Sequence, residues 1–247
     1  MSLLYVVMAG ANHVELAQEM VANNLANVNT TGFRADQEAF SSYIPSQSGL
    51  QTNAYVVNTA TTSDLSSGTI TYTGNPLDVA VTGPGFIAVK DKAGKEAYTR
   101  DGNLVIGKKG ILQTKQGDTV MSDGGPITIP PATTISIASD GTVSGVPTLY
   151  GQTLNSVNVL GRIKLVNPTA QQITKGSDGL FYTNNGQPLA VDDTVKIKGG
   201  ALEGSNVNIV DAMTQMIDLA RQFDMNMQLI KTVQQSGTNS GQILVLN

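Results

Sequence analysis

The sequence has no cysteine and a single histidine, His13. Without cysteine there is neither a disulfide nor a thiolate metal site. His13 has no second histidine with which to complete a catalytic triad or a usual zinc site. We therefore expect no cofactor, no metal and no enzymatic activity, and we interpret His13 as a surface or packing residue.

Charge is also scarce: charged residues make up 14% of the 247 positions, and the net charge is −4. Because ordinary soluble domains carry roughly 25% charged residues, Thr, Asn, Gln, Ser and Gly must supply most of the polar surface. That mixture suits β-strands and hydrated protein–protein contacts. The negative net charge argues against nucleic acid and anionic membranes as partners.

Long apolar runs are missing too. No segment reaches the ~20 apolar residues needed to cross a bilayer. The start, MSLLYVVMAG, lacks a basic n-region and runs directly into a helical pattern, so we do not expect a cleaved signal peptide. If the protein leaves the cytoplasm, it needs an export route that reads an uncleaved N-terminus.

Both ends of the chain carry helical periodicity, over residues 3–28 and 207–236. Apolar residues recur there at alternating spacings of three and four, the seven-residue repeat of a helix that packs on another helix. Ser205 and Asn206 precede the second helix as candidate caps, and Asp211 lies in its first turn. The first stripe is Leu4, Val7, Ala11, Val14, Gln18, Val21, Leu25 and Val28, and the second is Ile209, Met213, Met216, Ala220, Phe223, Met227 and Ile230.

Residues 68–200, between the helices, have the pattern of β-structure. LDVAV (77–81) alternates, and turn dipeptides then recur at nearly regular spacing, which leaves strands of five or six residues and predicts an antiparallel meander. NVLGRIKLVN and GLFYTNNGQPLAV belong to the same sheet-based domain. The turn dipeptides are Ala93-Gly94, Asp101-Gly102, Lys109-Gly110, Gln116-Gly117, Asp123-Gly124 and Asp140-Gly141.

The predicted fold class is α+β, with N- and C-terminal α-helices paired as a coiled coil and a central antiparallel β-rich domain. We assign residues 1–35 to the first helix, 36–76 to an extended connector, 77–200 to the β-domain and 201–247 to the second helix. Stretch 36–67 is rich in Ser, Thr and Asn, so we expect it to be partly disordered unless it packs on a neighbour. The tail SGTNSGQILVLN either extends the second helix or forms a short strand.

A single pair of helices leaves apolar residues uncovered. Met8, Leu16, Met20, Leu219 and Leu229 lie off the two stripes, and isolated helices or marginal pairs fray in water. The chain offers no further helices to cover them. We therefore expect its termini to become fully ordered only when they pack against other copies or other proteins.

The stretch ANNLANVNTTGFR (22–34) ends the first helix in four asparagines, two threonines and a glycine. Asparagine tolerates left-handed backbone, and its amide both donates and accepts hydrogen bonds. In a tight array of helices such residues would cap the helix end and bridge to adjacent chains, and Phe33 would anchor the departing chain. The alternative is an ordinary helix C-terminus followed by a loop.

Three motifs in the same order resemble those of the bacterial flagellar rod and hook family. ANNLANVNTTGFR resembles its N-terminal signature, and GPGFIAV (83–89) with YTRDGNLVIGKKGILQTKQGDTVM (98–121) resembles its central β-domain. LEGSNVNIVDAMTQMIDLARQFDMNMQLIKT (202–232) is similar to its C-terminal signature. The length and the start LLYVVMAGANHVE look most like a proximal rod subunit, and a distal rod or hook-type subunit is the alternative.

This resemblance implies a structural subunit of a helical drive shaft that transmits motor torque to the hook and filament. It implies export through the flagellar type III apparatus without a cleaved signal peptide, and a place in the basal-body rod within the periplasm. The terminal helices would form an inner coiled-coil layer and the β-domain an outer one. The implied partners are other rod subunits and the surrounding ring proteins, with no nucleic acid and no small-molecule substrate.

The residues we expect at assembly interfaces come from the two stripes and the flanking motifs. They are Leu4, Val7, Val14, Val21, Asn23, Asn24, Leu25, Asn27, Gly32, Phe33, Ser205, Asn206, Val207, Met213, Met216, Ala220, Phe223, Met227 and Ile230.

Two other functions are weighed against assembly. A secreted β-rich hydrolase needs two carboxylates about 5–9 Å apart in one cleft, whereas Asp192 and Asp193 are adjacent and favour a turn. An adhesin or binding module with a helical stalk predicts a closed oligomer instead of an open stack.

Arg100, in YTRDG, belongs either to a binding edge or to a hairpin in which it is paired locally. Gly83-Pro84-Gly85 lacks the Lys and Ser/Thr of a phosphate loop.

Overall fold

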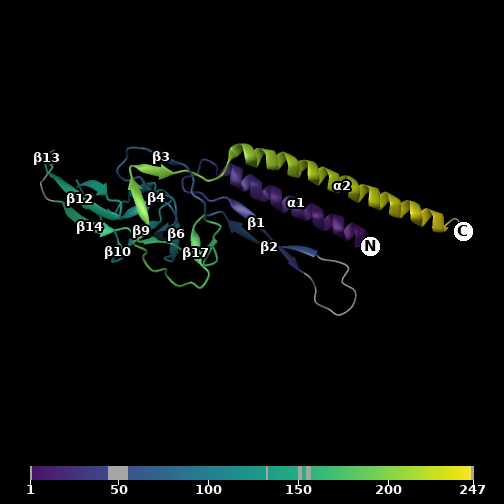
Figure 1. Ribbon diagram of the computed structural model, residues 1–247, viewed down its shortest axis with the longest axis horizontal. Helices are drawn as coiled ribbons and strands as arrows, with labels where there is room; N and C mark the ends of the chain where they lie inside the picture. Colours follow the sequence, from purple (N-terminus) through teal and green to yellow (C-terminus); the bar gives the residue numbers. More distant parts are fainter. Residues whose placement is uncertain (1, 44–54, 132, 150–151, 154–156, 246–247) are drawn as a thin grey trace. The chain divides into compact units, whose positions relative to one another are not determined.

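The computed structural model comprises two compact units, one built around helices and the other around β-sheets (Figure 1). This agrees with the predicted α+β class. The structure describes residues 2–43, 55–131, 133–149, 152–153 and 157–245. Unit 1 consists of residues 1–26, 36–62 and 208–247, and unit 2 of residues 27–35 and 63–207.

Unit 1 contains two long helices. Helix α1 spans Ser2–Ala26 and α2 spans Ile209–Val245. They lie side by side and run in opposite directions, and the C-terminal end of α2 extends beyond the N-terminal end of α1 (Figure 1). Helix α2 has 37 residues, which at 1.5 Å per residue gives a length of about 55 Å. It takes in most of the tail after residue 235, which therefore extends the helix and does not form a strand.

The rest of unit 1 is a two-stranded β-ribbon. Strand β1 (Asp36–Tyr43) pairs with β2 (Tyr55–Ser63), and β1 contacts α1. Both strands fall in the segment expected to be an extended connector, so that segment contains regular structure that its weak periodicity did not predict. Residues 44–54, also in the predicted connector, lie outside the described residues.

The cap of α2 differs from the prediction. The Asn208 side-chain oxygen accepts a hydrogen bond from the Val210 N–H at 3.0 Å, and its backbone carbonyl accepts the first helical bond from Ala212 at 3.0 Å. Asn208 is therefore the N-cap. Ser205 and Asn206, which the sequence offered as caps, lie before the helix in unit 2 and bond elsewhere.

Unit 2 holds the remaining strands, which are short. The first of them are β3 (Ile70–Tyr72), β4 (Val79–Thr82), β5 (Phe86–Lys90), β6 (Glu96–Thr99), β7 (Leu104–Ile106), β8 (Leu112–Thr114), β9 (Thr119–Ser122), β10 (Gly125–Pro126) and β11 (Thr133–Ile137). They are followed by β12 (Thr142–Leu149), β13 (Gln152–Thr153), β14 (Asn158–Arg162), β15 (Leu165–Val166), β16 (Ile173–Lys175), β17 (Phe181–Thr183), β18 (Lys196–Gly199) and β19 (Ala201–Glu203).

The largest described sheet is antiparallel but only partly a meander. Its order is β16-β17-β6-β5-β9-β8-β7, with β15 pairing β5 and β10 pairing β9. Strands β7, β8 and β9 follow one another as hairpins, as predicted. In contrast, β15 and β17 return from far along the chain to pair with β5 and β6. The meander expectation is therefore wrong for this part, because turn signals identify consecutive strands and not distant partners.

Alternating apolar residues of these strands fill the core of unit 2. Val79, Ile87 and Leu112 are fully buried in its main cluster, and Phe86 packs against Phe181 in a second one, with ring centroids 5.1 Å apart. Two late strands close the unit by pairing with early ones, β18 with β4 and β19 with β3. Among the described residues, neither helix carries an apolar stretch long enough to span a membrane.

Candidate assembly site

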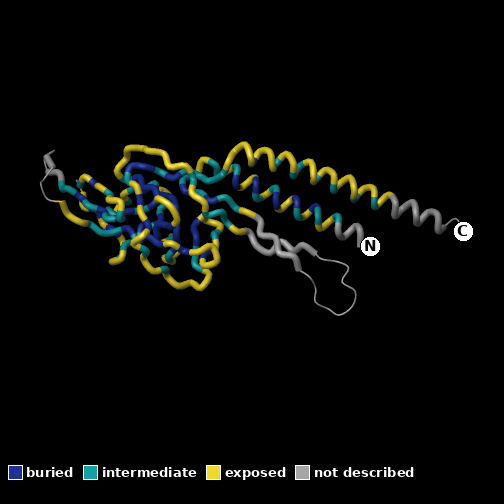
Figure 2. The backbone as a smooth tube through the Cα atoms, in the orientation of Figure 1, coloured by how far each residue is buried: buried dark blue, intermediate teal, exposed yellow. Residues whose placement is uncertain are grey.

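One face of α1 is buried. Figure 2 shows buried and exposed residues alternating along α1, whereas α2 is half-buried or exposed along most of its described length. Helix α1 is better covered because it contacts both α2 and β1. Its buried residues are Ala11, Val14, Ala17, Val21 and Asn24. Those of α2 that are buried or half-buried are Ala212, Met216, Leu219, Ala220, Phe223, Asn226, Ile230 and Val233.

The buried faces keep the predicted seven-residue repeat but not all of its residues. On α1, Ala17 and Asn24 are buried while their neighbours Gln18 and Leu25 are only half-buried. On α2, Met216, Phe223 and Ile230 face inward as predicted, whereas three predicted stripe residues are exposed. These three are Ile209, Met213 and Met227, at 43%, 51% and 38% exposure.

Side-chain size explains most of this shift. Ala212 replaces Met213 on the inner face, Asn226 replaces Met227, and Ala17 is preferred to Gln18. Small residues let helix backbones approach closely, and an ideal α-helix drifts by about 20° per heptad from a strict 3.5-residue repeat. Leu219, expected off the stripe, is half-buried and is the exception to the size rule.

Large apolar side chains remain on the outer faces. Met8, Leu16 and Leu229 are about half exposed, at 51%, 51% and 52%, as their positions off the stripes predicted. Met20 is half-buried. On α2, Val210, Met213 and Ile217 form a second stripe at helical spacing, and they are 70%, 51% and 55% exposed. Unit 1 therefore presents uncovered apolar surface on both helices.

Asn24 explains part of the asparagine-rich motif. Its amide nitrogen donates to the Asp36 carbonyl at 2.9 Å, and its amide oxygen accepts from the Asp36 N–H at 2.8 Å. The side chain thus imitates a paired strand backbone and joins the end of α1 to the start of β1. Asn27 begins the turn after α1, where its carbonyl accepts from the Thr30 N–H at 3.1 Å. Asn23, on the last turn, is exposed.

Gly32 and Phe33 continue the motif into unit 2. The Gly32 N–H donates to the Glu203 carbonyl at 2.8 Å. Its φ is +69°, and a Cβ there would stand 2.3 Å from the Arg100 carbonyl carbon, so only glycine fits. The Lys175 ammonium lies 3.9 Å from the centre of the Phe33 ring, and the Phe33 carbonyl accepts from the Asn206 N–H at 3.4 Å.

A buried charge cluster lies where the three motifs meet. Glu203 receives Arg34 on one carboxylate oxygen at 2.6 Å and Arg100 on the other at 2.9 Å, and all three side chains are at most 1% exposed. The Gly68 N–H also donates to this carboxylate, at 2.9 Å. Burial lowers the pKa of the Arg100 guanidinium, and the Glu203 carboxylate opposes that shift.

The cluster holds two cations for one carboxylate. Arg100 donates to the Gly83 carbonyl at 2.8 Å and lies 5.2 Å from the centre of the Phe86 ring, which offsets part of the excess charge. Within the described residues, Nε of both arginines is buried without a hydrogen-bond partner. Neither expectation for Arg100 is correct: it lines no binding edge, and its ion pair reaches 103 positions along the chain.

Asn206 ties the same region together. Its side-chain oxygen accepts from the Ala35 N–H at 2.7 Å, and its amide nitrogen donates to the carbonyls of Asp64 and Ser66 at 3.0 and 3.2 Å. Ser205 accepts from the Val207 N–H at 3.2 Å, and both residues are half-buried. The last residues of the first motif and the first residues of the third are thus bonded to each other inside unit 2.

Comparison with known proteins identifies the family. Residues 4–34 match a family model described as flagella basal body rod protein. Residues 80–145 match the flagellar hook protein FlgE/F/G D1 domain, and residues 198–236 match the flagellar basal body rod FlgEFG protein C-terminal. The flagellar basal-body rod protein FlgF of Salmonella typhimurium is 38% identical over 99% of this chain and 98% of its own length. This chain belongs to the flagellar basal-body rod protein family. The FlgF of Escherichia coli is 37% identical over the same shares, and a FlgG of Buchnera aphidicola is 29% identical over 94% of this chain and 95% of its own.

Membership of the rod family confirms the resemblance read from the three motifs. It makes the chain a structural subunit of the flagellar basal-body rod, and its relatives are structural proteins of the motility apparatus and not enzymes. The sequence did not single out Arg34 or Glu203 as functional residues. Their only signal was that Arg34 is the one charged residue of ANNLANVNTTGFR and that Glu203 lies at the start of the third motif, in a chain poor in charge.

Proposed function

We propose that this chain is a proximal-rod subunit whose α1 and α2 pair as a coiled coil and pack against the terminal helices of other axial subunits. The observation that carries the proposal is the outer stripe of α2. Val210, Met213 and Ile217 stay more than half exposed after α1 has covered the opposite face. A rod of this kind would transmit motor torque to the hook and filament.

The proposed interface comprises the inner faces, which hold the pair, and the outer faces, which meet neighbours. The contacts between α1 and α2 would be made by Val7, Val14, Val21, Leu25, Met216, Ala220, Phe223 and Ile230. The contacts with neighbouring subunits would be made by Met213 and Met227. Asn23, Asn27 and Val207 would flank these contacts, and Gly32, Phe33, Ser205 and Asn206 would hold the chain at its entry to unit 2. The side chain of Leu4 lies outside the described part of the structure. We include Leu4 in the proposed interface because of its position in the apolar stripe of the first helix.

The remaining proposals come from the family. The helices of residues 1–35 and 201–247 would form the inner layer and residues 77–200 the outer one, with 36–76 between them. The chain would reach the periplasm through the type III export apparatus without cleavage of its N-terminus, and ring proteins would surround the assembled rod. A proximal position is supported by two FlgF relatives at 38% and 37% identity over nearly the whole chain, against 29% for a FlgG relative.

The test separates the outer stripe from the helix pair. Met213→Lys and Ile217→Lys place charge on the outer face, and Gln222→Lys places the same charge at an exposed polar position of α2. We expect the first two variants to keep native circular dichroism but to lose motility in complementation and incorporation into purified basal bodies. The Gln222→Lys variant should assemble normally. Normal incorporation of both stripe variants would refute the proposal.

A further inference from the structure

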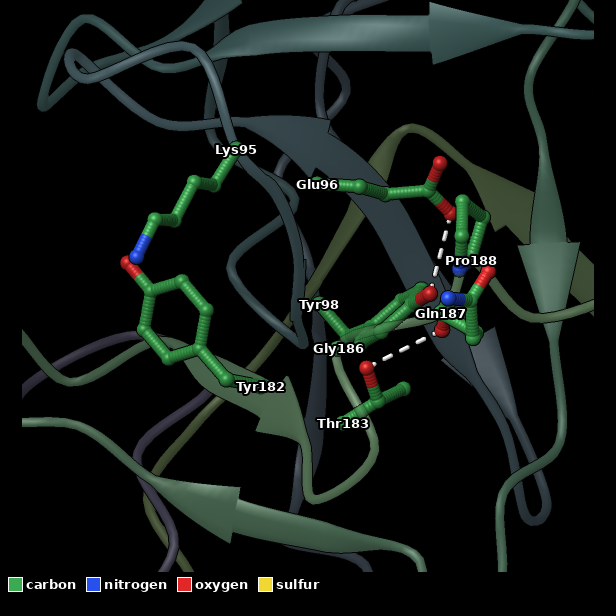
Figure 3. A pocket seen from close by; sticks show the side chains of 8 residues that line it. All are labelled: Lys95, Glu96, Tyr98, Tyr182, Thr183, Gly186, Gln187 and Pro188. Carbon is green, nitrogen blue, oxygen red and sulfur yellow. Dashed lines mark hydrogen bonds between the residues drawn. The ribbon is translucent and has the colours of Figure 1, made fainter.

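The loop after β17 contains the only Asn-Gly dipeptide of the sequence, Asn185-Gly186. Both residues are exposed. The loop and the end of β17 form one wall of a pocket of about 350 Å³, to which they contribute Thr183, Gly186, Gln187 and Pro188 (Figure 3). We propose that Asn185-Gly186 is a site of spontaneous covalent modification, at which the asparagine side chain cyclises on the backbone and then hydrolyses to aspartate and isoaspartate.

The reaction needs water as its only co-reactant. The Gly186 backbone nitrogen loses its proton to solvent base and adds to Cγ of Asn185, forming a C–N bond and a five-membered ring. The tetrahedral carbon then expels the side-chain nitrogen, which leaves as ammonia with a proton from solvent. Water adds to one of the two carbonyls of the resulting succinimide and opens the ring. The net change is the gain of one water and the loss of one ammonia.

The loop geometry favours the first step. The Gln187 N–H donates to the side-chain oxygen of Asn185 at 3.0 Å. That oxygen carries the developing negative charge when nitrogen adds to Cγ, so a fixed donor there stabilises the addition as an oxyanion hole does. Gly186 presents no side chain to hinder attack, and no heavy atom lies within 4 Å of where a Cβ would stand.

The attacking nitrogen is only loosely held. The Gly186 N–H donates to the Thr183 carbonyl at 3.2 Å, the long end of the range for such bonds. The loop is anchored on either side by shorter bonds, from the Asn184 N–H to the Gln172 carbonyl at 2.9 Å and from the Leu189 N–H to the Tyr98 hydroxyl at 2.8 Å. Figure 3 draws a further bond across the loop, from the Thr183 hydroxyl to the Gln187 carbonyl at 3.0 Å. The anchors hold the Gln187 donor in place, and the Gly186 N–H has only its long bond to the Thr183 carbonyl to break before it loses its proton.

Asn184 is a matched control in the same loop. Its amide oxygen accepts from the Thr174 hydroxyl at 2.6 Å, and its amide nitrogen donates to the Gln171 carbonyl at 2.7 Å. Both ends of the amide are therefore held, and the next residue, Asn185, has a side chain that hinders attack. The structure thus predicts opposite behaviour for two adjacent asparagines.

The product would change the pocket wall. Either form of the product adds one negative charge beside Gly186 and Gln187, which line the pocket. Isoaspartate also adds one carbon to the backbone and moves the Gln187 N–H away from its acceptor. Unit 2 would thus acquire a permanent negative charge, and the fraction of subunits that carry it would increase with their age.

The experiment incubates the full-length protein in mildly alkaline buffer and follows peptides 172–188 by mass spectrometry and isoaspartyl methyltransferase labelling. We expect product at Asn185 and none at Asn184, at a rate at least equal to that of the chain unfolded in urea. Gln187→Pro removes the N–H donor and should slow the folded-state reaction roughly tenfold, which is less than the loss of about 10²–10³ for a buried oxyanion-hole donor because this loop is exposed. Gly186→Ala should slow it in both the folded and the unfolded states.

Three outcomes would overturn the proposal. They are a folded-state rate well below the unfolded rate, equal modification of Asn184, and a Gln187→Pro variant with native circular dichroism and an unchanged rate. The last outcome would show that the loop donor plays no part.

Discussion

Units 1 and 2 bury their apolar residues to different degrees. In unit 2, Val79, Ile87 and Leu112 are completely buried, and even the charged side chains of Arg34, Arg100 and Glu203 find partners inside it. In α2, Ala212 is the one described residue that is less than a tenth exposed. Unit 2 therefore completes its own core, whereas unit 1 leaves apolar side chains exposed on both helices, the surface that we propose a neighbouring subunit covers.

The largest effect should come from the charge cluster. Glu203→Ala leaves Arg34 and Arg100 buried without a counter-charge, and breaking a buried pair in this way typically costs about 3–5 kcal/mol. We expect unit 2 to unfold at a markedly lower urea concentration. Near-ultraviolet circular dichroism of its tyrosines measures this unfolding. Hydrogen exchange should accelerate around residues 32–35 and 68–72, which bond to Glu203 or its neighbours.

An exposed ion pair provides the control. Arg162 and Asp193 also lie 2.6 Å apart, but their side chains are 31% and 76% exposed, and such pairs contribute about 0–1 kcal/mol. Asp193→Ala should therefore leave the unfolding midpoint almost unchanged. If Glu203→Ala lowered the unfolding midpoint no more than Asp193→Ala, the buried charge cluster would not be important for the stability of unit 2.

Gly32→Ala should have the next largest effect. The added Cβ would collide with the backbone of Arg100 at 2.3 Å, and alanine would have to adopt a φ of +69°. We expect the two effects together to lower the free energy of unfolding by about 2–3 kcal/mol. Gly83→Ala is the control, because Gly83 has a φ of +79° with no atom within 4 Å of the added Cβ. It should cost only the conformational strain, roughly 1 kcal/mol. Equal losses in urea denaturation would mean that the Gly32 backbone can move away.

The sequence predicted the elements better than their partners. The terminal helices and the hairpins β7 to β9 follow from local periodicity and turn residues, so they were predicted. The return of β15 to β5 and the pairing of Arg34 with Glu203, 169 positions apart, depend on the folded topology, and local patterns carry no information about it.

The inner faces of the helices were predicted only in part, for a different reason. Gln18 and Ala17 both satisfy a repeat of three and four, as do Met213 and Ala212. The spacing alone does not choose between them, because the choice depends on how closely the partner helix approaches. Alanine permits the closer approach, so the smaller residue turns inward and the larger one outward.

A smaller effect is expected within unit 1. Val14 is 3% exposed on the inner face of α1 and Leu16 is 51% exposed on the outer one. Val14→Ala should lower the stability of the isolated subunit by about 1–2 kcal/mol through lost burial, and Leu16→Ala should leave it nearly unchanged. Thermal unfolding followed at the helical far-ultraviolet signal measures both. Equal losses would show that the outer face is already covered in the single chain.

The smallest predicted effect is a gain, and it tests whether unit 2 tolerates every charge that it buries. Asp101 is 7% exposed, and burial raises the pKa of its carboxyl, an effect that hydrogen bonding from the Asn103 N–H and the charge of Lys115 oppose. Because the folded-state pKa lies above the unfolded one, the folded state binds more protons in between, and stability falls as the pH rises through that window. Asp101→Asn keeps an oxygen to accept from the Asn103 N–H, 3.0 Å away, and removes the charge. We expect it to raise Tm at neutral pH by roughly 2–4 °C, equivalent to about 1 kcal/mol at most, and to remove this fall in stability as the pH rises through the window. A lower Tm at neutral pH would mean that the negative charge of Asp101 stabilises the fold.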